Sequence, residues 1–397
     1  MKVRVILLAL FAGAAGCELI ANIPSSNSNR PDGSMSGDDA SASGDDAGSG
    51  SDAMNECTTN VECTTAAKPT CDNHVCRECR IDAECGANGV CLLDGTCAAE
   101  ARILYVAPTG SGAVCSAAAP CSLDTSVASL SATKDVIKLA AATYTLTTSI
   151  KIKPAIPVTM AGEGATLVGG ADPLNFMVES NGPGTTITGI TFDEQTWYAG
   201  YCEGGKVTYS RTTWLNGGLG FFSTAQCDFT LDYSVVKTQA AYAGYFSNGA
   251  SIVHIRNSML VDNGTAGNAN PVFTISGTGT TGAVENTTIA GNHGSTNSLV
   301  CVAGITARNV ISFGNAAPPT NECVVSYSDI EAGYGGANDH NVTLDPQFVS
   351  ATDFHLQAAS PVRGIGDPAA VLPLDVDLQV RPQPAGTAPD LGADEVP

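Results

Sequence analysis

Two charged side chains occupy equivalent positions of two similar segments in the middle of the chain and could do acid–base chemistry. Several segments of this region can be laid over one another, and equivalent positions in the first and third carry Asp193 and Lys237. If equivalent positions stack on successive turns, these side chains share one face, about 10 Å apart. A carboxylate and a basic group could abstract a proton or hydrolyse a glycosidic bond. Glu194, Glu203 and Lys206 complete the set of catalytic candidates.

The repeat that would position these groups has a period of 22 to 29 residues. Its six copies begin at Gly189, Arg211, Tyr233, Asn257, Asn286 and Asn309. Three positions on, the copies carry Phe192, Trp214, Val236, Leu260, Ile289 and Ser312; six positions on, they carry Gln195, Gly217, Gln239, Asn263, Asn292 and Asn315. Short β-branched copies punctuated by glycine and asparagine indicate a solenoid of strands, in which each turn buries its apolar face against the next. We therefore expect an apolar column and an amide ladder, with the extra residues of the longest copy looping out near 263–270.

Aromatic side chains follow the first three copies and form a second candidate site. They are Trp197, Tyr198, Tyr201, Phe221, Phe222, Tyr242, Tyr245 and Phe246. Aromatic faces stack on sugar rings, and the nearby Glu203 and Lys206 could bond hydroxyl groups. Two interpretations stay open: the rings fill the interior of the coil, or they form a ligand surface on which Trp197 and Tyr201 are exposed.

The charge balance restricts the partners. The chain has 39 acidic and 18 basic residues, a net charge of −21, so nucleic acid is not an expected partner and an acidic polysaccharide is disfavoured. Only twelve lysines and arginines follow residue 100, which argues against a lyase. The five histidines lack metal-ligand spacing, and phosphate-binding loops, nucleophile elbows and dinucleotide fingerprints are missing from the sequence. We expect no metal and no cofactor.

The first residues predict export. A basic start, an apolar run over 5–11 and small residues over 12–16 form a signal peptide spanning 1–16, too short to cross a membrane. The sequence Ala-Ala-Gly-Cys at 14–17 resembles a bacterial lipobox, which implies cleavage before Cys17 and its acylation, and several acyl chains anchor stably. Ordinary cleavage, with Cys17 incidental, is the alternative. We expect a protein anchored by lipid to a bacterial membrane, at the outer membrane or cell surface.

The segment 17–56 is rich in serine, glycine and aspartate and predicts a disordered, extended tether, although its paired aspartates could be read as calcium ligands. After it, two groups of four cysteines fall in 57–100. They are Cys57, Cys63, Cys71 and Cys76, then Cys79, Cys85, Cys91 and Cys97. A short exported segment of this kind predicts disulfides of open connectivity, with zinc as the alternative because of Cys76-x2-Cys79 and the nearby His74. The pattern resembles Cys-rich repeats on exported proteins of some predatory and soil bacteria, which implies a stalk or interaction module.

Six further cysteines agree with the repeat. Cys202 and Cys227, like Cys301 and Cys323, are separated by about one period, so each pair could join adjacent turns. Cys115 and Cys121 would close a small loop.

Both ends of the region 101–397 resemble known proteins. Leu104–Gly112, a short amphipathic stretch from Leu123 to Leu130, and apolar runs at 135–139, 143–146 and 158–162 resemble the opening of right-handed parallel β-helix proteins of the pectin-lyase-like class. That resemblance implies a short helix that caps the first turn. Asp345–Phe348, Asp353–Leu356 and Asp390–Ala393 resemble the closing segment of bacterial β-helix surface proteins. The expected fold is all-β: a right-handed parallel β-helix solenoid with an N-terminal capping helix.

Three alternative functions are consistent with these features of the sequence. The leading hypothesis is a surface-anchored lipoprotein that binds a polysaccharide or other cell-envelope ligand without catalysis. The alternative is a polysaccharide lyase or glycoside hydrolase, since the resemblance implies Ca²⁺ and a basic residue for a lyase and clustered aspartates for a hydrolase. A purely structural spacer is the third.

Overall fold

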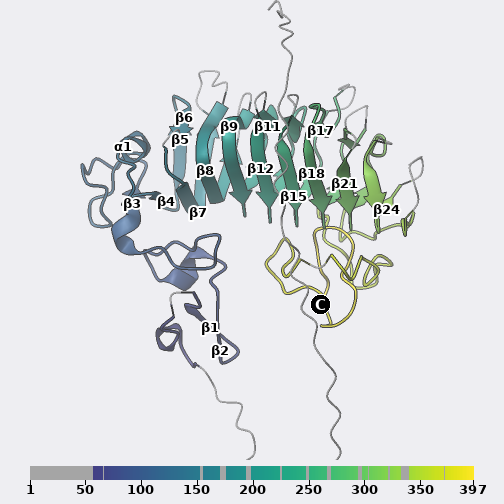
Figure 1. Ribbon diagram of the computed structural model, residues 1–397, viewed down its shortest axis with the longest axis horizontal. Helices are drawn as coiled ribbons and strands as arrows, with labels where there is room; N and C mark the ends of the chain where they lie inside the picture. Colours follow the sequence, from purple (N-terminus) through teal and green to yellow (C-terminus); the bar gives the residue numbers. More distant parts are fainter. Residues whose placement is uncertain are drawn as a thin grey trace, which may run out of the picture. The chain divides into compact units, whose positions relative to one another are not determined.

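The computed structural model describes residues 57–397, except 66, 153–154, 170–175, 194–197, 224–225, 247–249, 266–269, 294–296, 303, 321, 332–338 and 371. The described residues belong to one compact unit, 54–397. Parallel strands follow one another along it as a coil (Figure 1). The predicted parallel β-solenoid is confirmed.

The strands of the coil form three parallel sheets, which we call sheets I, II and III. Sheet I contains β3 (Ile103–Val106), β4 (Val136–Leu139), β12 (Cys227–Asp232), β15 (Ile252–Arg256), β18 (Thr281–Glu285), β21 (Ile305–Arg308) and β23 (Val324–Ser326). Sheet II contains β5 (Thr143–Leu146), β10 (Thr213–Leu215), β13 (Val235–Lys237), β16 (Met259–Val261), β19 (Thr288–Ala290), β22 (Ile311–Phe313) and β24 (Asp329–Ile330). Sheet III contains β6 (Ile150–Ile152), β11 (Leu219–Ser223), β14 (Gly244–Phe246), β17 (Phe273–Ile275) and β20 (Leu299–Val300).

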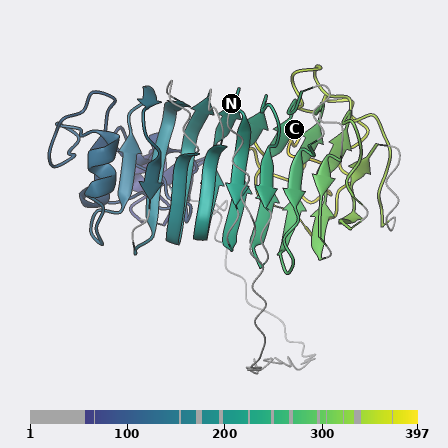
Figure 2. The ribbon, with the colours of Figure 1, turned by 90° about the horizontal axis from the view of Figure 1, so that it is seen from above.

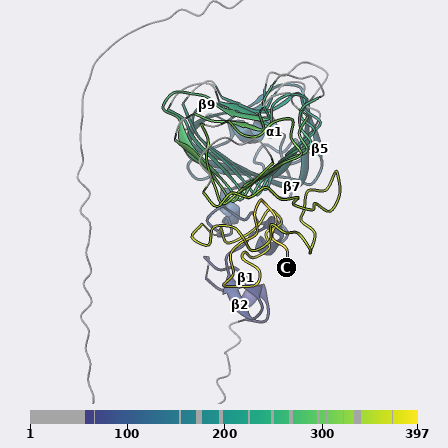
Figure 3. The ribbon, with the colours of Figure 1, turned by 90° about the vertical axis from the view of Figure 1, so that its right-hand side faces the viewer.

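Three long strands bend and take part in more than one sheet: β7 (Val158–Gly169), β8 (Phe176–Asp193) and β9 (Tyr198–Ser210). Figure 2 shows the strands side by side along the coil, and Figure 3 shows the walls that they form when the coil is seen end-on. Every wall presents one face to the interior and one to the outside, so alternate residues of a strand have opposite surroundings.

The first residue of each predicted repeat turns the chain from sheet I into sheet II. These residues have positive φ angles: Gly189 (69°), Arg211 (54°), Tyr233 (47°), Asn257 (44°), Asn286 (45°) and Asn309 (54°). The left-handed conformation is easiest for glycine and asparagine, and it reverses the local course of the chain at a single residue. This backbone requirement explains why glycine and asparagine recur at the repeat's first position.

The predicted apolar column is confirmed. Strand pairing aligns Phe192, Trp214, Val236, Leu260, Ile289 and Ser312 in one register, and all six side chains are buried. Ser312, which interrupts the apolar run, hydrogen-bonds Ser298 at 2.9 Å between the two hydroxyl oxygens. That bond satisfies the polar group in the interior.

The predicted amide ladder is confirmed too. The Asn263 backbone N donates to Asn292 Oδ1 at 2.8 Å, and Asn292 Nδ2 donates to Asn315 Oδ1 at 2.8 Å. Gln239 extends the ladder by one turn, because its backbone N donates to Asn263 Oδ1 at 3.1 Å. The ladder supplies partners to backbone groups in the bend after sheet II that strand pairing leaves unpaired.

A short helix stands at the first turn, as the resemblance implies. Helix α1 (Leu123–Ala128) begins after Ser122, whose side chain accepts a hydrogen bond from the backbone N of Thr125 at 3.2 Å. Leu123 is buried in the core of the coil, and Val127 packs against that core.

All eight cysteines of the two N-terminal modules form disulfides, so none is a free thiolate for zinc. The pairs are Cys57–Cys71, Cys63–Cys76, Cys79–Cys91 and Cys85–Cys97. Around them lie η1 (Asn60–Glu62), β1 (Thr70–Asp72), β2 (Val75–Arg77), η2 (Asp82–Cys85) and η3 (Glu100–Arg102). The pairing is first-to-third and second-to-fourth in each group, which the spacing alone left open.

The second module packs on the outer face of sheet I. Val90 and Ala98 form a buried cluster with Ile103, Tyr105 and Val136, which point outward from β3 and β4. Fully apolar strands with two buried faces need such a cover. The module therefore completes the first turns of the solenoid in addition to any stalk role.

The other cysteines pair as predicted. Cys202 bonds Cys227 and Cys301 bonds Cys323, each across adjacent turns, and Cys115 bonds Cys121.

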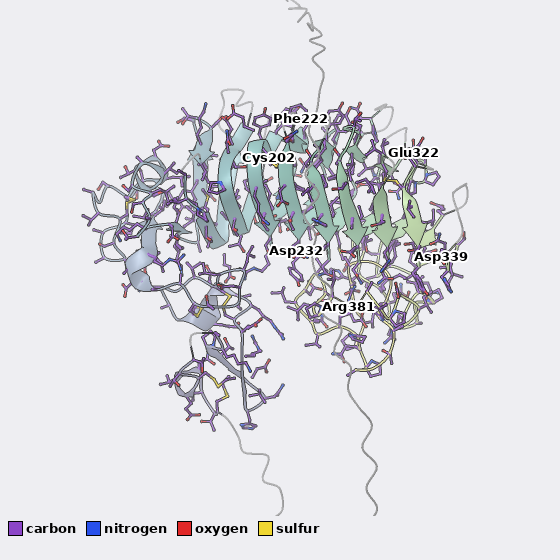
Figure 4. The ribbon with its side chains drawn as sticks, viewed as in Figure 1. Cys202, Phe222, Asp232, Glu322, Asp339 and Arg381 are labelled. Atoms are coloured by element: carbon purple, nitrogen blue, oxygen red, sulfur yellow. A yellow bond between two sulfur atoms is a disulfide. The ribbon has the colours of Figure 1, made fainter. Side chains whose placement is uncertain are left out.

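The C-terminal residues 343–397, which we call the closing segment, pack on the outer face of sheet II (Figures 3 and 4). Phe354 and Ala393 cover the outward-facing Met259, Val261 and Ala290. The registers of Met259 and Val261 mix polar and apolar residues in earlier turns, such as Lys237 and Leu215. The segment has its own buried ion pair, Arg381–Glu395, with both side chains fully buried and Nε 3.1 Å from Oε2.

Candidate functional site

An outward-facing column of aromatic rings crosses sheet III. Strand pairing aligns Tyr201 of β9, Phe222 of β11 and Tyr245 of β14 on successive turns. The Phe222 ring lies 5.9 Å from Tyr201 and 5.8 Å from Tyr245 between centroids, with interplanar angles of 21° and 7°. We call these three rings, with Tyr198 and Tyr242, the aromatic column.

Tyr198 and Tyr242 widen the column on its two sides. Tyr198 stacks on Phe222 with centroids 4.4 Å apart, and Tyr242 contacts Tyr245 at 5.2 Å. Tyr242 also donates its hydroxyl to Oδ1 of Asn270 at 2.9 Å. Burial, then the neighbouring Tyr242 and Tyr245, raise the pKa of Tyr198, so its phenol stays protonated.

Alternation along the strands divides the predicted aromatic residues into two groups. Phe221 and Phe246 point into the coil and are buried, whereas all five rings of the aromatic column are half-buried on the outside. The interior interpretation is therefore confirmed for Phe221 and Phe246, and the column lies on the outer face, where a ligand surface stays a prediction. Trp197 lies outside the described residues. Figure 4 shows Phe222 on the side of the coil away from Arg381 of the closing segment.

A charged pair extends the same register toward the N-terminal turns. Lys151 of β6 aligns with Glu179 of β8, which aligns with Tyr201. Lys151 Nζ lies 3.4 Å from Glu179 Oε2, and the lysine is largely exposed while the carboxylate is buried. In the opposite direction, the register continues to the small side chain of Thr274. The outer register of sheet III thus presents charge, then aromatic rings, then a small polar residue.

The predicted catalytic residues lie in two places. Asp193 and Lys237 are in one register of sheet II, on the outer face, with Leu215 between them. Asp193 accepts a hydrogen bond from Nδ2 of Asn216 at 2.9 Å. The Lys237 charge helps to hold the pKa of Asp353 below its usual range, after the larger effect of His355, so Lys237 lies near the closing segment.

Glu203 and Lys206 lie elsewhere, in β9 where the chain passes from sheet III to sheet I. Both side chains are exposed, and Lys206 pairs with Asp228 of the next turn, its Nζ 3.3 Å from Oδ2. The structure therefore does not join these two residues to Asp193 and Lys237. Glu194 lies outside the described residues.

The closing segment contains a cluster that the sequence did not reveal. His355 lies between two carboxylates, with Nδ1 2.5 Å from Asp353 Oδ1 and Nε2 3.0 Å from Asp377 Oδ2. These bonds, that of Asp377 first, raise the pKa of His355 to about 9. Asp394 is the third carboxylate near this ring. The only signal in the sequence was the His355 of the closing motif, because its partners Asp377 and Asp394 are far along the chain.

Cys17 lies outside the described residues. Within the described part of the chain, none of the helices is both long and apolar enough to span a membrane.

No protein-family model and no curated protein matches the chain. Among solved structures, the crystal structure of pectate lyase Pel9A is similar: 16% of aligned residues are identical, the TM-score is 0.48, and the match covers 75% of this chain and 97% of that one.

Proposed function

We propose that this chain is a non-catalytic carbohydrate-binding protein of the bacterial cell surface. The observation that carries the proposal is the aromatic column: five half-buried rings gathered on the outer face of one sheet. Aromatic side chains left at a surface cost hydrophobic free energy unless a ligand or partner covers them. Their flat apolar faces are complementary to the C–H faces of sugar rings.

The ring geometry suits an extended glycan. Carbon atoms in contact are about 3.5–4.0 Å apart, so parallel rings with centroids nearly 6 Å apart overlap only partly. Part of each face is then left uncovered by its neighbour. Because Tyr201, Phe222 and Tyr245 come from successive turns, we expect a bound glycan to run along the coil rather than across it.

The charge of the chain narrows the ligand class. A net charge of −21 repels an anionic uronan and leaves neutral or cationic polysaccharides as the favoured ligands. Glu179 is next to Tyr201 in the register and Lys151 is one turn further, so we expect these charged groups to bond sugar hydroxyls at one end of the column.

The proposal includes a lipid anchor at Cys17, with residues 17–56 as the tether to the folded unit. It is supported by the lipobox-like sequence and by the acidic Ser/Gly-rich composition that follows. Cys17→Ala should release the chain from the membrane fraction into the soluble fraction. Mass spectrometry of the N-terminal peptide tests the modification directly, and an unacylated Cys17 in membrane-bound protein would rule out this anchor.

The binding proposal is tested on a glycan array with the full chain, followed by affinity measurements on each hit. Phe222→Ala and Tyr245→Ala should each weaken binding about tenfold, since each removes one stacking ring. Tyr327→Ala is the matched control, because Tyr327 is also a half-buried stacked aromatic residue, 4.4 Å from the His340 ring, but is not in the column. Equal losses in all three variants, or no hit at all, would refute the proposal.

The enzyme alternative has one observation in its favour, which is the shared register of Asp193 and Lys237. Incubation of the full chain with each hit tests it, with unsaturated products and new reducing ends as readouts. Product formation that Lys237→Ala or Asp193→Ala abolishes would replace the binding function by a catalytic one.

A further inference from the structure

The groups around His355 have the composition and the separation of a small metal site. A ligand nitrogen of His355 and one carboxylate oxygen each from Asp377 and Asp394 all lie within 4.8 Å of one another. Metal–ligand bonds of 2.0–2.2 Å in a tetrahedral site place the ligand atoms about 3.3–3.6 Å apart. The observed distance between His355 Nε2 and Asp377 Oδ2 is 3.0 Å, so a small outward shift of the two side chains would admit an ion.

The orientation of the imidazole is fixed by a group outside this set. Asp353 bonds Nδ1 of His355, on the side of the ring opposite to Nε2. Metal-binding histidines usually donate their second ring N–H to a carboxylate or carbonyl, which fixes the tautomer and makes the ligating nitrogen more basic. Asp353 is placed for that role, and Nε2 then faces Asp377.

Asp394 is the buried member of this group of three side chains. Its side chain is only 6% exposed, and Oδ2 accepts a hydrogen bond from the backbone N of Leu356 at 2.6 Å. A charged carboxylate on a largely buried residue is costly, and a cation bound beside it would compensate its charge.

We propose that His355, Asp377 and Asp394 bind one divalent transition-metal ion, and that Zn²⁺ is the ion best suited to these ligands. One imidazole and two carboxylates suit zinc and related first-row metals, whereas Ca²⁺ prefers six to eight oxygen ligands. The ion takes the position between His355 Nε2 and Asp377 that a proton occupies in the metal-free protein. This site is on the closing segment and is independent of the aromatic column on sheet III.

The three ligands come from three stretches of the closing segment. His355 follows Phe354 and Asp394 follows Ala393, and these neighbours both pack on the outer face of sheet II. Asp377 comes from the turn between Leu374 and Val380, which form a β-bridge. An ion at this site therefore joins the turn to the two stretches that cover sheet II. Its role is to lock the cover over the apolar outward side chains of the last turns.

Calorimetric titration of the full, chelator-treated chain with Zn²⁺ tests the proposal. The expected result is one ion per chain, with binding at least tenfold weaker in Asp377→Asn. Asp377 is partly exposed, so this variant should fold, and its circular dichroism checks that it does. His293→Gln is the matched control, because His293 pairs with a single carboxylate, Asp262, at 2.9 Å and should leave binding unchanged.

Substitution of Co²⁺ for Zn²⁺ gives a second readout, the visible absorption of a cobalt ion with a nitrogen ligand, which His355→Gln should abolish. Ca²⁺ should neither bind nor displace zinc. Absence of zinc binding, unchanged affinity in Asp377→Asn, or a preference for Ca²⁺ would each overturn the proposal. A loss of binding in His293→Gln equal to that in Asp377→Asn would also overturn it.

Discussion

Phe354 of the closing segment lies directly over Gly291, at the end of a sheet II strand. A Cβ atom at Gly291 would stand 2.7 Å from Cζ of the Phe354 ring, closer than side-chain atoms approach. Gly291 also has a φ angle of 62°, so the position requires glycine both for its backbone conformation and because there is no room for a Cβ atom. The contact places the closing segment against sheet II and gives a direct way to loosen it.

We expect Gly291→Ala to lower the free energy of unfolding by about 2–4 kcal/mol, from left-handed strain plus the clash with Phe354. Gly314→Ala is the control, because Gly314 has nearly the same φ, 64°, one turn later and no atom within 3.4 Å of the added Cβ. It should cost only about 1 kcal/mol. Urea unfolding measures both values, and equal losses would show that Phe354 does not constrain this position.

Removal of one uncharged side chain from the amide ladder should strongly lower the free energy of unfolding. Asn292 Nδ2 donates to Leu260 O and to Asn315 Oδ1, and its Oδ1 accepts from the Asn263 backbone. Asn292→Ala leaves these buried groups unpaired, so we expect a loss of about 3 kcal/mol in urea unfolding. The exposed Asn88 serves as control, and its alanine variant should stay within about 0.5 kcal/mol of the parent. A similar change in both variants would mean that the ladder adds little stability.

Each disulfide should stabilise the folded chain by an amount that increases with the length of the loop that it closes. Cys202–Cys227 has a sequence separation of 25 and Cys115–Cys121 a separation of 6. The entropic model predicts losses of about 3.5 and about 2 kcal/mol when each pair is replaced by serines. Denaturant unfolding of the two double variants checks the order. A larger loss for the Cys115–Cys121 variant would show that native packing, rather than loop closure, determines the contribution.

Asp329 predicts a pH dependence of stability. Burial raises its pKa to about 6, with Asp345 and Glu331 adding to the shift, while the hydrogen bond from Leu344 N opposes it. A carboxyl whose pKa is higher in the folded state than its unfolded value of 3.8 holds its proton more tightly when folded. Its stabilising contribution is therefore complete below the unfolded pKa and is lost as the pH rises through about 6.

Asp329→Asn removes this titration. Relative to the parent, the variant should gain up to about 3 kcal/mol of stability between pH 4 and pH 7. Unfolding curves at the two pH values measure the difference, and subtracting the parent cancels the contribution of other buried acids such as Asp232. A stability difference that is the same at both pH values would contradict the raised pKa.

The sequence predicted those parts of the fold that depend on neighbouring turns. The left-handed corner favours glycine and asparagine, so Asn257, Asn286 and Asn309 mark it, although other residue types occupy it in two earlier turns. Side chains at equivalent positions stack on one another, so the spacing of the copies gave the register of Phe192 with Trp214 and the pairing of Cys202 with Cys227. Local backbone geometry and a nearly regular period were sufficient for both.

Relations between distant parts of the chain needed the tertiary structure. Phe221 and Phe222 are identical in type and adjacent, and only the position of the core decides that the first ring is inside and the second outside. The same holds for Asp193 and Glu203, which are close in sequence but belong to different walls of the coil. His355, Asp377 and Asp394 meet because the closing segment folds back on itself over sheet II, and no period in the sequence encodes that contact. Stacking repeats a local rule at every turn, whereas the docking of a non-repeating segment depends on the particular shape that it covers.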